Sequence, residues 1–234
     1  MINKQRGTLY GIGVGPGDPE LMTLKALNRI REAEVVALPG NPAEETMAYR
    51  IAVQICPELS EKTLLPLDFP MTKDPVRLAE AHTSAAKAIT AHLDAGRDVA
   101  FLTLGDPTVY STYLYLHKMI RNSGREAVII NGVPSFCAAA AEAGLSLAEN
   151  DETIHILAGN CDDGLVSSLS GTRVLMKSGK KLAAVLDQVD EQDSVCIVEN
   201  CGLPEQRIYY DRRQIDERTG YFTLAIIKRK EEQL

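Results

Sequence analysis

The sequence has no tryptophan, and aromatic side chains make up only 5% of its 234 residues. It also lacks any apolar run near the roughly 20 residues that a membrane-spanning helix needs. The segment from Met1 to Gly7 contains no apolar stretch of the kind that secretory signals carry. These absences predict a globular protein that is neither inserted in a membrane nor exported.

Cysteine pairs with metal-binding spacing are missing as well. The five cysteines form no Cys-x-x-Cys pair; they are Cys56, Cys137, Cys161, Cys196 and Cys201. An odd number without a disulfide framework is typical of reduced thiols in the cytoplasm. No cysteine or histidine cluster has the spacing of a metal site. We therefore expect a cytoplasmic protein that holds no metal of its own.

Positive charge is in the minority. The chain has 25 Lys and Arg against 32 Asp and Glu, a formal net charge of −7. Because nucleic-acid binding relies on clustered Lys and Arg, we expect no nucleic-acid partner. The same net charge repels any polyanionic ligand at long range. Such a ligand would need a local basic patch.

Short apolar runs alternate with longer amphipathic stretches, which is the pattern of an α/β protein. After the first apolar strand, the pattern predicts one helix from Pro19 to Glu32, with Asp18 as its N-cap. After the apolar strand that ends at Leu104, it predicts a helix from Thr108 to Arg121. Enough apolar residues are present for one large core or two small ones.

A small polar break at residues 122–124 follows the second of these helices. Such a break predicts a joint between an N-terminal α/β domain, 1–122, and a C-terminal α+β domain, 125–234. The second half reads as richer in strands. The first of them, Ala127 to Ile130, is accordingly predicted to belong to the second domain.

The first segment with chemical potential is Gly11-Ile-Gly-Val-Gly-Pro-Gly-Asp-Pro-Glu20, between a strand and a helix. Its glycines would let a ligand approach the backbone, and a helix N-terminus favours negative charge. The dinucleotide fingerprint G-x-G-x-x-G fails in both registers, because its third glycine would be Pro16 or Asp18. A ligand-binding turn and a purely structural turn both remain open.

Two further segments follow the same pattern. Phe101-Leu-Thr-Leu-Gly-Asp-Pro-Thr-Val-Tyr-Ser-Thr112 delivers Asp106 to the end of a strand, where open α/β sheets bind ligands. Asp106 is equally explained as the cap of the next helix. In Asn131-Gly-Val-Pro-Ser-Phe-Cys-Ala-Ala-Ala140 the chain reverses and Ser135 caps a helix. Each segment alone fits a structural role as well as a functional one.

Together, in this order and spacing, the three segments resemble the tetrapyrrole methylase family. The resemblance runs from Leu9 to Tyr221, nearly the whole chain. It implies two α/β domains with S-adenosylmethionine in the cleft between them, transfer of a methyl group to a tetrapyrrole, and a homodimer.

Further segments are similar to the branch of the family that methylates C(20) of precorrin-2 or cobalt-factor II. They are Leu67-Asp-Phe-Pro-Met-Thr-Lys-Asp74, Gly105 to Tyr115, Val174 to Lys177, Val198 to Gly202 and Gly220 to Leu224. The family's uroporphyrinogen methylases usually carry Asp where this chain has Pro39, which disfavours that substrate. Another corrin intermediate, uroporphyrinogen, or a non-catalytic tetrapyrrole carrier remain the alternatives.

Carried over residue by residue, the resemblance implies a cofactor site made of backbone turns and apolar walls. The implied cofactor-binding residues are Pro16, Leu104, Gly105, Asp106, Val109, Ser135, Phe136, Met176, Cys201 and Thr223. Asp106 would accept a hydrogen bond from, or pair with, the cationic amino-acid portion of the cofactor. Cys201 is interpreted as a small wall residue and not as a nucleophile.

The sequence does not name the base that takes the proton from the methylated carbon. Tyr110 is a weak candidate, together with the four histidines, which are His82, His92, His117 and His155. Each histidine is better explained as structural or exposed.

A substrate with many carboxylates makes a basic patch testable. The substrate-binding candidates are Lys73 and Arg77, after the F-P-M-T segment, and Lys177, with Lys180 and Lys181 close behind it. For any single one of them, an ordinary surface charge is the competing interpretation.

Overall fold

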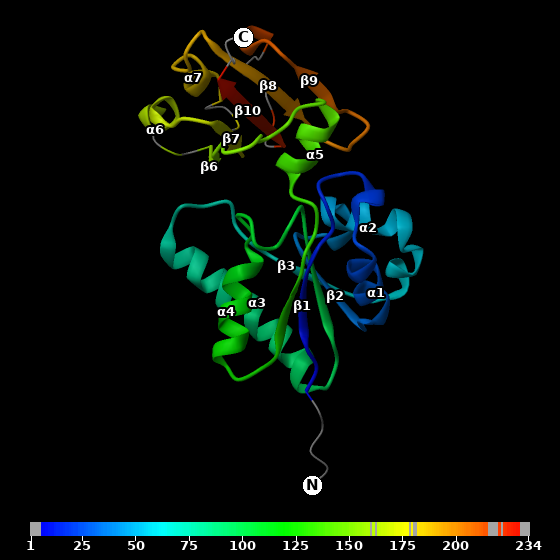
Figure 1. Cartoon of the computed structure of the whole chain (residues 1–234). Helices are drawn as coiled ribbons and strands as arrows, with labels where there is room; N and C mark the ends of the chain where they lie inside the picture. The colour runs from blue at the N-terminus through cyan, green and yellow to red at the C-terminus, as the bar shows by residue number, and fades with distance from the viewer. Residues whose placement is uncertain are drawn as a thin grey trace. The chain divides into compact units, whose positions relative to one another are not determined.

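The computed structural model of the chain describes residues 6–159, 161, 163–177, 179, 182–214, 220 and 222–229. The chain divides into two compact units, Met1–Pro134 and Ser135–Leu234. Each unit is built on a five-stranded sheet with helices packed against it (Figure 1). The predicted fold class, α/β with two units, is confirmed.

The sheet of the first unit is parallel, with strand order β3-β2-β4-β1-β5. Its strands are β1 (Leu9–Gly13), β2 (Val35–Pro39), β3 (Thr63–Leu67), β4 (Val99–Thr103) and β5 (Ala127–Ile130). Its α-helices are α1 (Leu24–Glu32), α2 (Met47–Ile55), α3 (Pro75–Asp94) and α4 (Tyr113–Asn122).

Helices cover both faces of this sheet, with α1 and α2 on one side and α3 and α4 on the other (Figure 1). The central strands are therefore buried on both faces. This is why they read as continuous apolar runs and not as alternating patterns. All five strands run in the same direction, so their carboxyl ends lie at one edge.

Both predicted helices differ from the structure at their N-terminal ends, for local reasons. Asp18 is an N-cap and accepts from Glu20 N, as predicted, but it caps a short 3₁₀ turn, Pro19–Leu21, and α1 follows as a separate helix. Thr23 has an extended backbone, and its hydroxyl accepts a hydrogen bond from Ala26 N, so it caps α1 instead of continuing the turn. The helix predicted from Thr108 starts only at Tyr113. Between them Tyr110 has a left-handed backbone, φ 46°, which no α-helix contains.

The two units divide eleven residues after the predicted joint at 122–124. Strand β5 was expected in the second unit, but it pairs with β1, from Leu9↔Ala127 to Ile12↔Ile130, and so completes the first sheet. The small polar break is an ordinary helix-to-strand turn, with Gly124 at φ 74°. The division falls instead at Pro134 and Ser135.

The sheet of the second unit is mixed, with order β6-β7-β10-β8-β9; β6 and β7 are parallel and the other pairs antiparallel. Its strands are β6 (Ile154–Ala158), β7 (Thr172–Met176), β8 (Asp193–Glu199), β9 (Arg207–Tyr209) and β10 (Thr223–Arg229). Its helices are α5 (Ser135–Glu142), α6 (Asp163–Ser168) and α7 (Leu182–Leu186). The pattern did not predict α6 or β9, which are short.

One face of this second sheet carries α6 and α7 over a compact apolar core, while α5 contacts β10. Lys180, Lys181 and Tyr221, which figured in the sequence predictions, lie outside the described residues.

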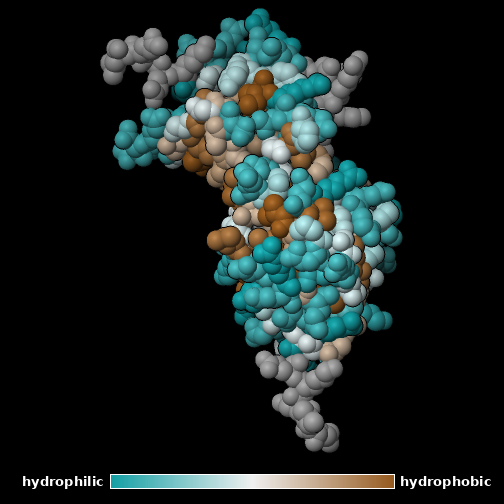
Figure 2. Space-filling model, turned by 90° about the vertical axis from the view of Figure 1, so that its right-hand side faces the viewer, coloured by the Kyte–Doolittle hydropathy of each residue, from teal (hydrophilic) through white to brown (hydrophobic). Residues whose placement is uncertain are grey.

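The face drawn in Figure 2 is mostly hydrophilic, with hydrophobic residues interspersed in small groups. Within the described part of the chain, no helix combines the length and apolar character needed to cross a membrane. The described residues also include no group of three or more His, Cys, Asp or Glu side chains placed to hold a metal ion.

Candidate cofactor site at the strand ends

The three glycine-containing segments meet at the carboxyl edge of the first sheet. They follow β1, β4 and β5, which are neighbours in the order β4-β1-β5. Gly15 and Gly105 form an antiparallel bridge in which Gly105 N donates to Gly15 O at 2.8 Å and Gly15 N to Gly105 O at 3.3 Å. Thr23 Oγ1 donates to the Asn131 carbonyl at 3.3 Å. These contacts join parts of the chain that are 90 and 108 positions apart.

The glycines at this edge are required by backbone packing. A Cβ atom at Gly13 would lie 2.4 Å from the Gly105 carbonyl oxygen, and one at Gly132 would lie 2.2 Å from the same oxygen. Neither position has a left-handed backbone, so the demand is for space and not for conformation. The glycines of the first segment were predicted to let a ligand approach, and Gly132 to reverse the chain; at Gly13 and Gly132 the missing side chain makes room for the Gly105 carbonyl.

Asp106 lies at the centre of this arrangement and is 5% exposed. Its Oδ1 accepts hydrogen bonds from Thr108 N at 2.7 Å and from the Thr108 hydroxyl. Its Oδ2 accepts from Asn131 Nδ2 at 3.0 Å and from Gly132 N at 3.1 Å. Burial alone would raise the pKa of Asp106, but these donors together outweigh it and hold the pKa below its ordinary value.

The other cofactor residues expected in the first unit surround this point. Pro16 follows the bridged Gly15, Leu104 and Gly105 follow β4, and Val109 N donates to the Asp106 carbonyl at 3.2 Å. Pro16, Leu104 and Val109 are half-buried. The structure therefore places all five first-unit candidates at one edge of one sheet.

The second unit also collects its candidates at one end of its sheet. Met176 ends β7 and lies opposite Leu224, the neighbour of Thr223 on β10. Thr223 lies opposite Glu199, the last residue of β8, and its hydroxyl donates to Glu199 Oε1 at 3.3 Å. Cys201 follows two positions later.

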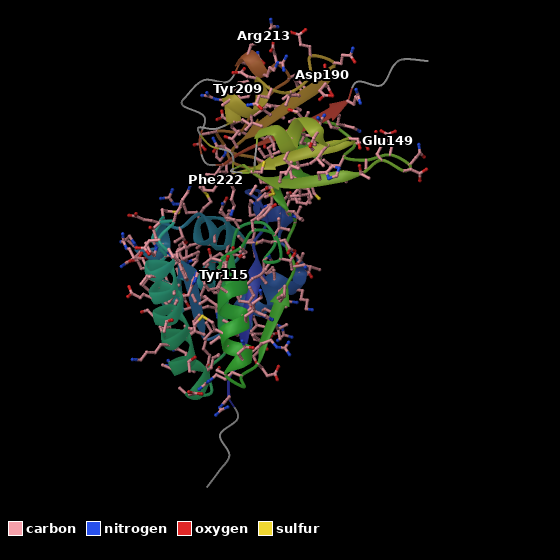
Figure 3. All side chains as sticks on the ribbon, turned by 90° about the vertical axis from the view of Figure 1, so that its left-hand side faces the viewer. Tyr115, Glu149, Asp190, Tyr209, Arg213 and Phe222 are labelled. Carbon is pink, nitrogen blue, oxygen red and sulfur yellow. The ribbon has the colours of Figure 1, made fainter. Side chains whose placement is uncertain are left out.

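The remaining two candidates of the second unit, Ser135 and Phe136, are on α5, which contacts β10. Phe222, which is labelled in Figure 3, directly precedes Thr223 in the sequence and is 42% exposed.

Cys201 is a buried residue with a weakly acidic thiol. Its side chain is 6% exposed, and burial together with the Glu142 carboxylate raises the pKa of its thiol to about 11. A thiol with that pKa is protonated at neutral pH and is a poor nucleophile.

The histidines of the first unit are packed side chains. The His82 ring stacks on Tyr115 with 4.8 Å between ring centroids and contacts Phe69; Figure 3 labels Tyr115 on α4. His117 Nδ1 lies 3.0 Å from the hydroxyl of the buried Tyr113. Burial lowers the pKa of both imidazoles. His82 is accounted for by packing between α3 and α4, and His117 by its contact with Tyr113 on the same helix.

Tyr110 differs from the histidines. It lies in the turn between Asp106 and α4, is 45% exposed, and has φ 46°. A bulky residue in the left-handed region is uncommon and costs about 1–2 kcal/mol, so this backbone is held by its surroundings. Tyr110 therefore stays a candidate for the base that accepts the proton.

The basic candidates are exposed. Lys73 lies in the segment after β3, and Arg77 lies in the first turn of α3, where Asp74 accepts from Val76 N and Arg77 N. Lys177 follows β7 directly and has φ 57°. Lys73 and Arg77 share one end of one unit, whereas Lys177 belongs to the other unit.

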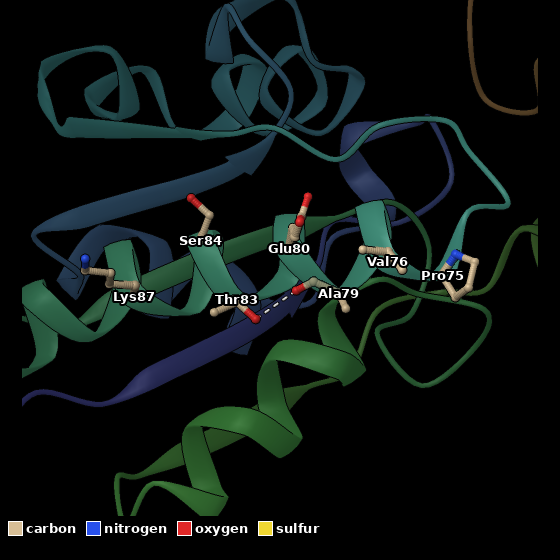
Figure 4. A pocket seen from close by; sticks show the side chains of 7 residues that line it. All are labelled: Pro75, Val76, Ala79, Glu80, Thr83, Ser84 and Lys87. Carbon is tan, nitrogen blue, oxygen red and sulfur yellow. Dashed lines mark hydrogen bonds between the residues drawn. The ribbon is translucent and has the colours of Figure 1, made fainter.

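A hollow on the first unit lies along α3 alone, from Pro75 to Lys87 (Figure 4). The Thr83 hydroxyl donates to the Ala79 carbonyl there at 2.8 Å. The hollow contains none of the expected cofactor residues. Its lining comes from one helix, so no second element opposes it to enclose a ligand.

The sequence interpretation missed the partners of Asp106. Asn131, Gly132 and Thr108 were within the quoted segments, but Asn131 and Gly132 were treated as part of a chain reversal and Thr108 as the start of a helix. The only signal was the recurrence of Asn-Gly and Asp-Pro directly after apolar strands. Which of these strands are neighbours becomes visible only in the sheet.

Solved structures similar in fold to this chain include two tetrapyrrole methyltransferases. Uroporphyrin-III C-methyltransferase from Thermus thermophilus, solved with S-adenosyl homocysteine, superposes with a TM-score of 0.71 at 23% identity, over 95% of this chain and 97% of that chain. Cobalt precorrin-4 methyltransferase, CbiF, superposes with a TM-score of 0.73 at 20% identity, over 94% of each chain. At these identities the likeness defines the fold.

Sequence comparison defines the family. The family model Tetrapyrrole (Corrin/Porphyrin) Methylases matches residues 8–215. The chain is 33% identical to the probable cobalt-precorrin-2 C(20)-methyltransferase of Methanocaldococcus jannaschii, over 97% of this chain and 99% of that protein. It is 30% identical to the precorrin-2 C(20)-methyltransferase of a Sinorhizobium species, over 94% and 95%. The chain belongs to the tetrapyrrole methylase family.

Proposed function

We propose that the protein is an S-adenosylmethionine-dependent methyltransferase that methylates C(20) of precorrin-2 or of its cobalt complex in cobalamin biosynthesis. The observation that carries this proposal is the 33% identity to the Methanocaldococcus protein over 97% of the chain. A second relative of the same printed activity, from Salmonella typhimurium, matches 96% of the chain at 26% identity.

The strand ends fit a cofactor of this kind. The bridge between Gly15 and Gly105 holds the turns after β1 and β4 together, and Leu104 and Val109, both half-buried beside it, offer apolar walls. Phe136, Met176 and Cys201, the apolar candidates of the second unit, are buried within that unit. When bound, S-adenosylmethionine supplies a methyl group already activated by its sulfonium.

The chain itself therefore needs to bind, orient and exclude water. Alignment of two reacting groups is worth about 7–11 kcal/mol in well-oriented systems. This fits a site dominated by fixed backbone turns with few ionisable side chains. We propose Tyr110 as the first residue to examine for the proton-accepting step, since it lies beside Val109 and is exposed.

The proposal is tested by an anaerobic assay with methyl-labelled S-adenosylmethionine and with precorrin-2 and cobalt-factor II in parallel, followed by NMR of the product. We expect the label at C(20), and the preferred ring assigns the route. Label at another carbon would change the methylated position but keep the chemistry. Binding of the cofactor without transfer to either ring would overturn the substrate, and other corrin intermediates and uroporphyrinogen would be offered next. Ring binding without consumption of the cofactor would favour a carrier and contradict an enzyme.

We also propose that the protein is a homodimer, as the resemblance to the family implies. Light scattering on the purified protein should then give twice the 25.5 kDa of one chain. A mass of 25.5 kDa at working concentration would refute this.

Removing the exposed cations beside the first sheet should weaken substrate binding specifically. We expect Lys73→Ala with Arg77→Ala to raise the KM for the tetrapyrrole about fivefold or more and to leave the KM for S-adenosylmethionine unchanged. The reason is that each lost surface ion pair is worth up to about 1 kcal/mol. Lys177→Ala should act in the same direction.

Lys87→Ala is the matched control for this prediction, because Lys87 is an exposed cation on the same helix, farther from its first turn. Steady-state kinetics at low and high salt provide the measurement. An equal rise in the tetrapyrrole KM for Lys87→Ala, or no rise for the double variant, would reject these residues as the patch.

A further inference from the structure

All hydrogen-bonding positions of Asp106 are filled from within the protein. A carboxylate offers about four lone-pair positions. Oδ1 takes two donors from Thr108, and Oδ2 takes Asn131 Nδ2 and Gly132 N. The residue is only 5% exposed, so very little of it is open to a ligand. An ammonium group pairing with Asp106 would have to displace one of these donors and leave it buried and unpaired, at a cost comparable to what the new bond supplies.

The donors belong to two different turns. Thr108 follows β4, whereas Asn131 and Gly132 follow β5, and β1 lies between these strands in the sheet. The Gly105 carbonyl fits against Gly13 and Gly132 because neither of these two residues carries a side chain. The Asp106 carboxylate is the side chain that ties the two outer turns together across β1.

We propose that Asp106 is a positioning residue: a clasp between the turns after β4 and β5 that acts on S-adenosylmethionine only through the backbone it holds, without touching the cofactor's amino group. This inference rests on the proposed function, which places the cofactor at these strand ends. It replaces the expectation that Asp106 pairs with the cationic amino-acid portion.

Asparagine at position 106 separates the two roles, because it keeps the shape but turns one acceptor into a donor. In one orientation its amide NH₂ faces two donors, Asn131 Nδ2 and Gly132 N; in the other it faces Thr108 N. Either way at least one buried donor loses its acceptor. The clasp is loosened, and the amino group of a bound cofactor is affected only indirectly.

The test is a thermodynamic cycle that crosses Asp106→Asn with removal of the ligand's amino group. Dissociation constants are measured by calorimetry for S-adenosylhomocysteine and for its analogue lacking the α-amino group. A clasp weakens both ligands by the same factor, about tenfold or more, so that the ratio of the two constants stays within twofold of wild type. A loss at least tenfold greater for S-adenosylhomocysteine than for the analogue would establish a direct contact and overturn the proposal.

Two further variants keep the test informative if Asp106→Asn folds poorly. Thr108→Val removes one donor without changing the carboxylate, and should weaken both ligands equally by a few-fold. Asp106→Asn combined with Asn131→Asp returns an acceptor opposite the new amide. It should recover part of the melting temperature and affinity that Asp106→Asn alone loses. No recovery of either quantity would contradict the clasp.

Failure of the proposed function gives a different pattern. A wild-type protein that binds neither compound would refute a cofactor site at these turns. The melting temperatures of the single and double variants would still report whether Asp106 joins the turns.

Discussion

Gly132→Ala is expected to disrupt the carboxyl edge of the first sheet and lower the free energy of unfolding by about 3 kcal/mol or more. The added Cβ would lie 2.2 Å from the Gly105 carbonyl oxygen and 2.8 Å from Gly13 C, and both are backbone atoms. Overpacking costs about 1–3 kcal/mol where side chains can move aside. Here no flexible side chain can yield, so the sheet or the turn has to shift.

Affinity for S-adenosylhomocysteine should fall with it, because the same shift separates the turns after β1, β4 and β5. Stability is measured by urea denaturation followed by circular dichroism, since the chain has no tryptophan. Affinity is measured by calorimetry under conditions in which the variant is folded.

Two other glycines provide controls for the separate effects of an added methyl group. A Cβ at Gly220 would meet no described residue within 4 Å, and the backbone there is not left-handed, so Gly220→Ala should leave stability unchanged. Gly124 has equally open surroundings but φ 74°, so Gly124→Ala should show only the conformational cost of about 1–2 kcal/mol. A Gly132→Ala variant no less stable than Gly124→Ala would contradict the close approach.

The sequence predicted the fold class because hydrophobic periodicity reports burial directly. Strands β1, β2 and β4 are buried on both faces and are continuous apolar runs in the sequence. Helices such as α3 are amphipathic, with apolar residues at helical spacing on the buried face. Element boundaries were harder, because they depended on single side chains. The hydroxyl of Thr23 and the left-handed backbone of Tyr110 each moved a helix start by several residues.

The spatial order of the strands was beyond the sequence. Strand β5 was predicted in the second unit because a polar break precedes it, yet it pairs with β1 at the far edge of the first sheet. The motifs after β1, β4 and β5 were all recognised one by one. Their convergence, and the role of Asp106 in joining two of them, follow from the order β4-β1-β5, and nothing within each motif encodes that order.

Removal of one partner from the buried ion pair of the second unit should be the most destabilising charge substitution there. Arg173 Nη2 lies 2.7 Å from Asp193 Oδ2, and both side chains are 5% exposed. Arg173 Nη1 also donates to the Val166 carbonyl of α6 at 3.4 Å. Arg173→Met leaves Asp193 buried without a partner, which costs about 3–5 kcal/mol.

Arg213 offers the matched control within the same unit. Its guanidinium lies at the same distance, 2.7 Å, from the Asp211 carboxylate, but its side chain is 86% exposed. Water solvates both partners there, so Arg213→Met should leave the free energy of unfolding unchanged. The two pairs share their residue types and their shortest distance, and they differ in burial and in the bond of Arg173 to α6.

A third variant separates the cost of an unpaired charge from the worth of the pair. Replacing both partners, Arg173→Met with Asp193→Leu, removes the buried charges together and should restore most of the stability that Arg173→Met loses, because apolar replacements of buried pairs are often neutral or stabilising. Arg173 Nε has no hydrogen-bond partner among the described residues, so the wild-type pair already contains one buried donor without an acceptor. A double variant as unstable as Arg173→Met would mean that Arg173 stabilises the unit through its packing and its bond to α6, and not through its charge.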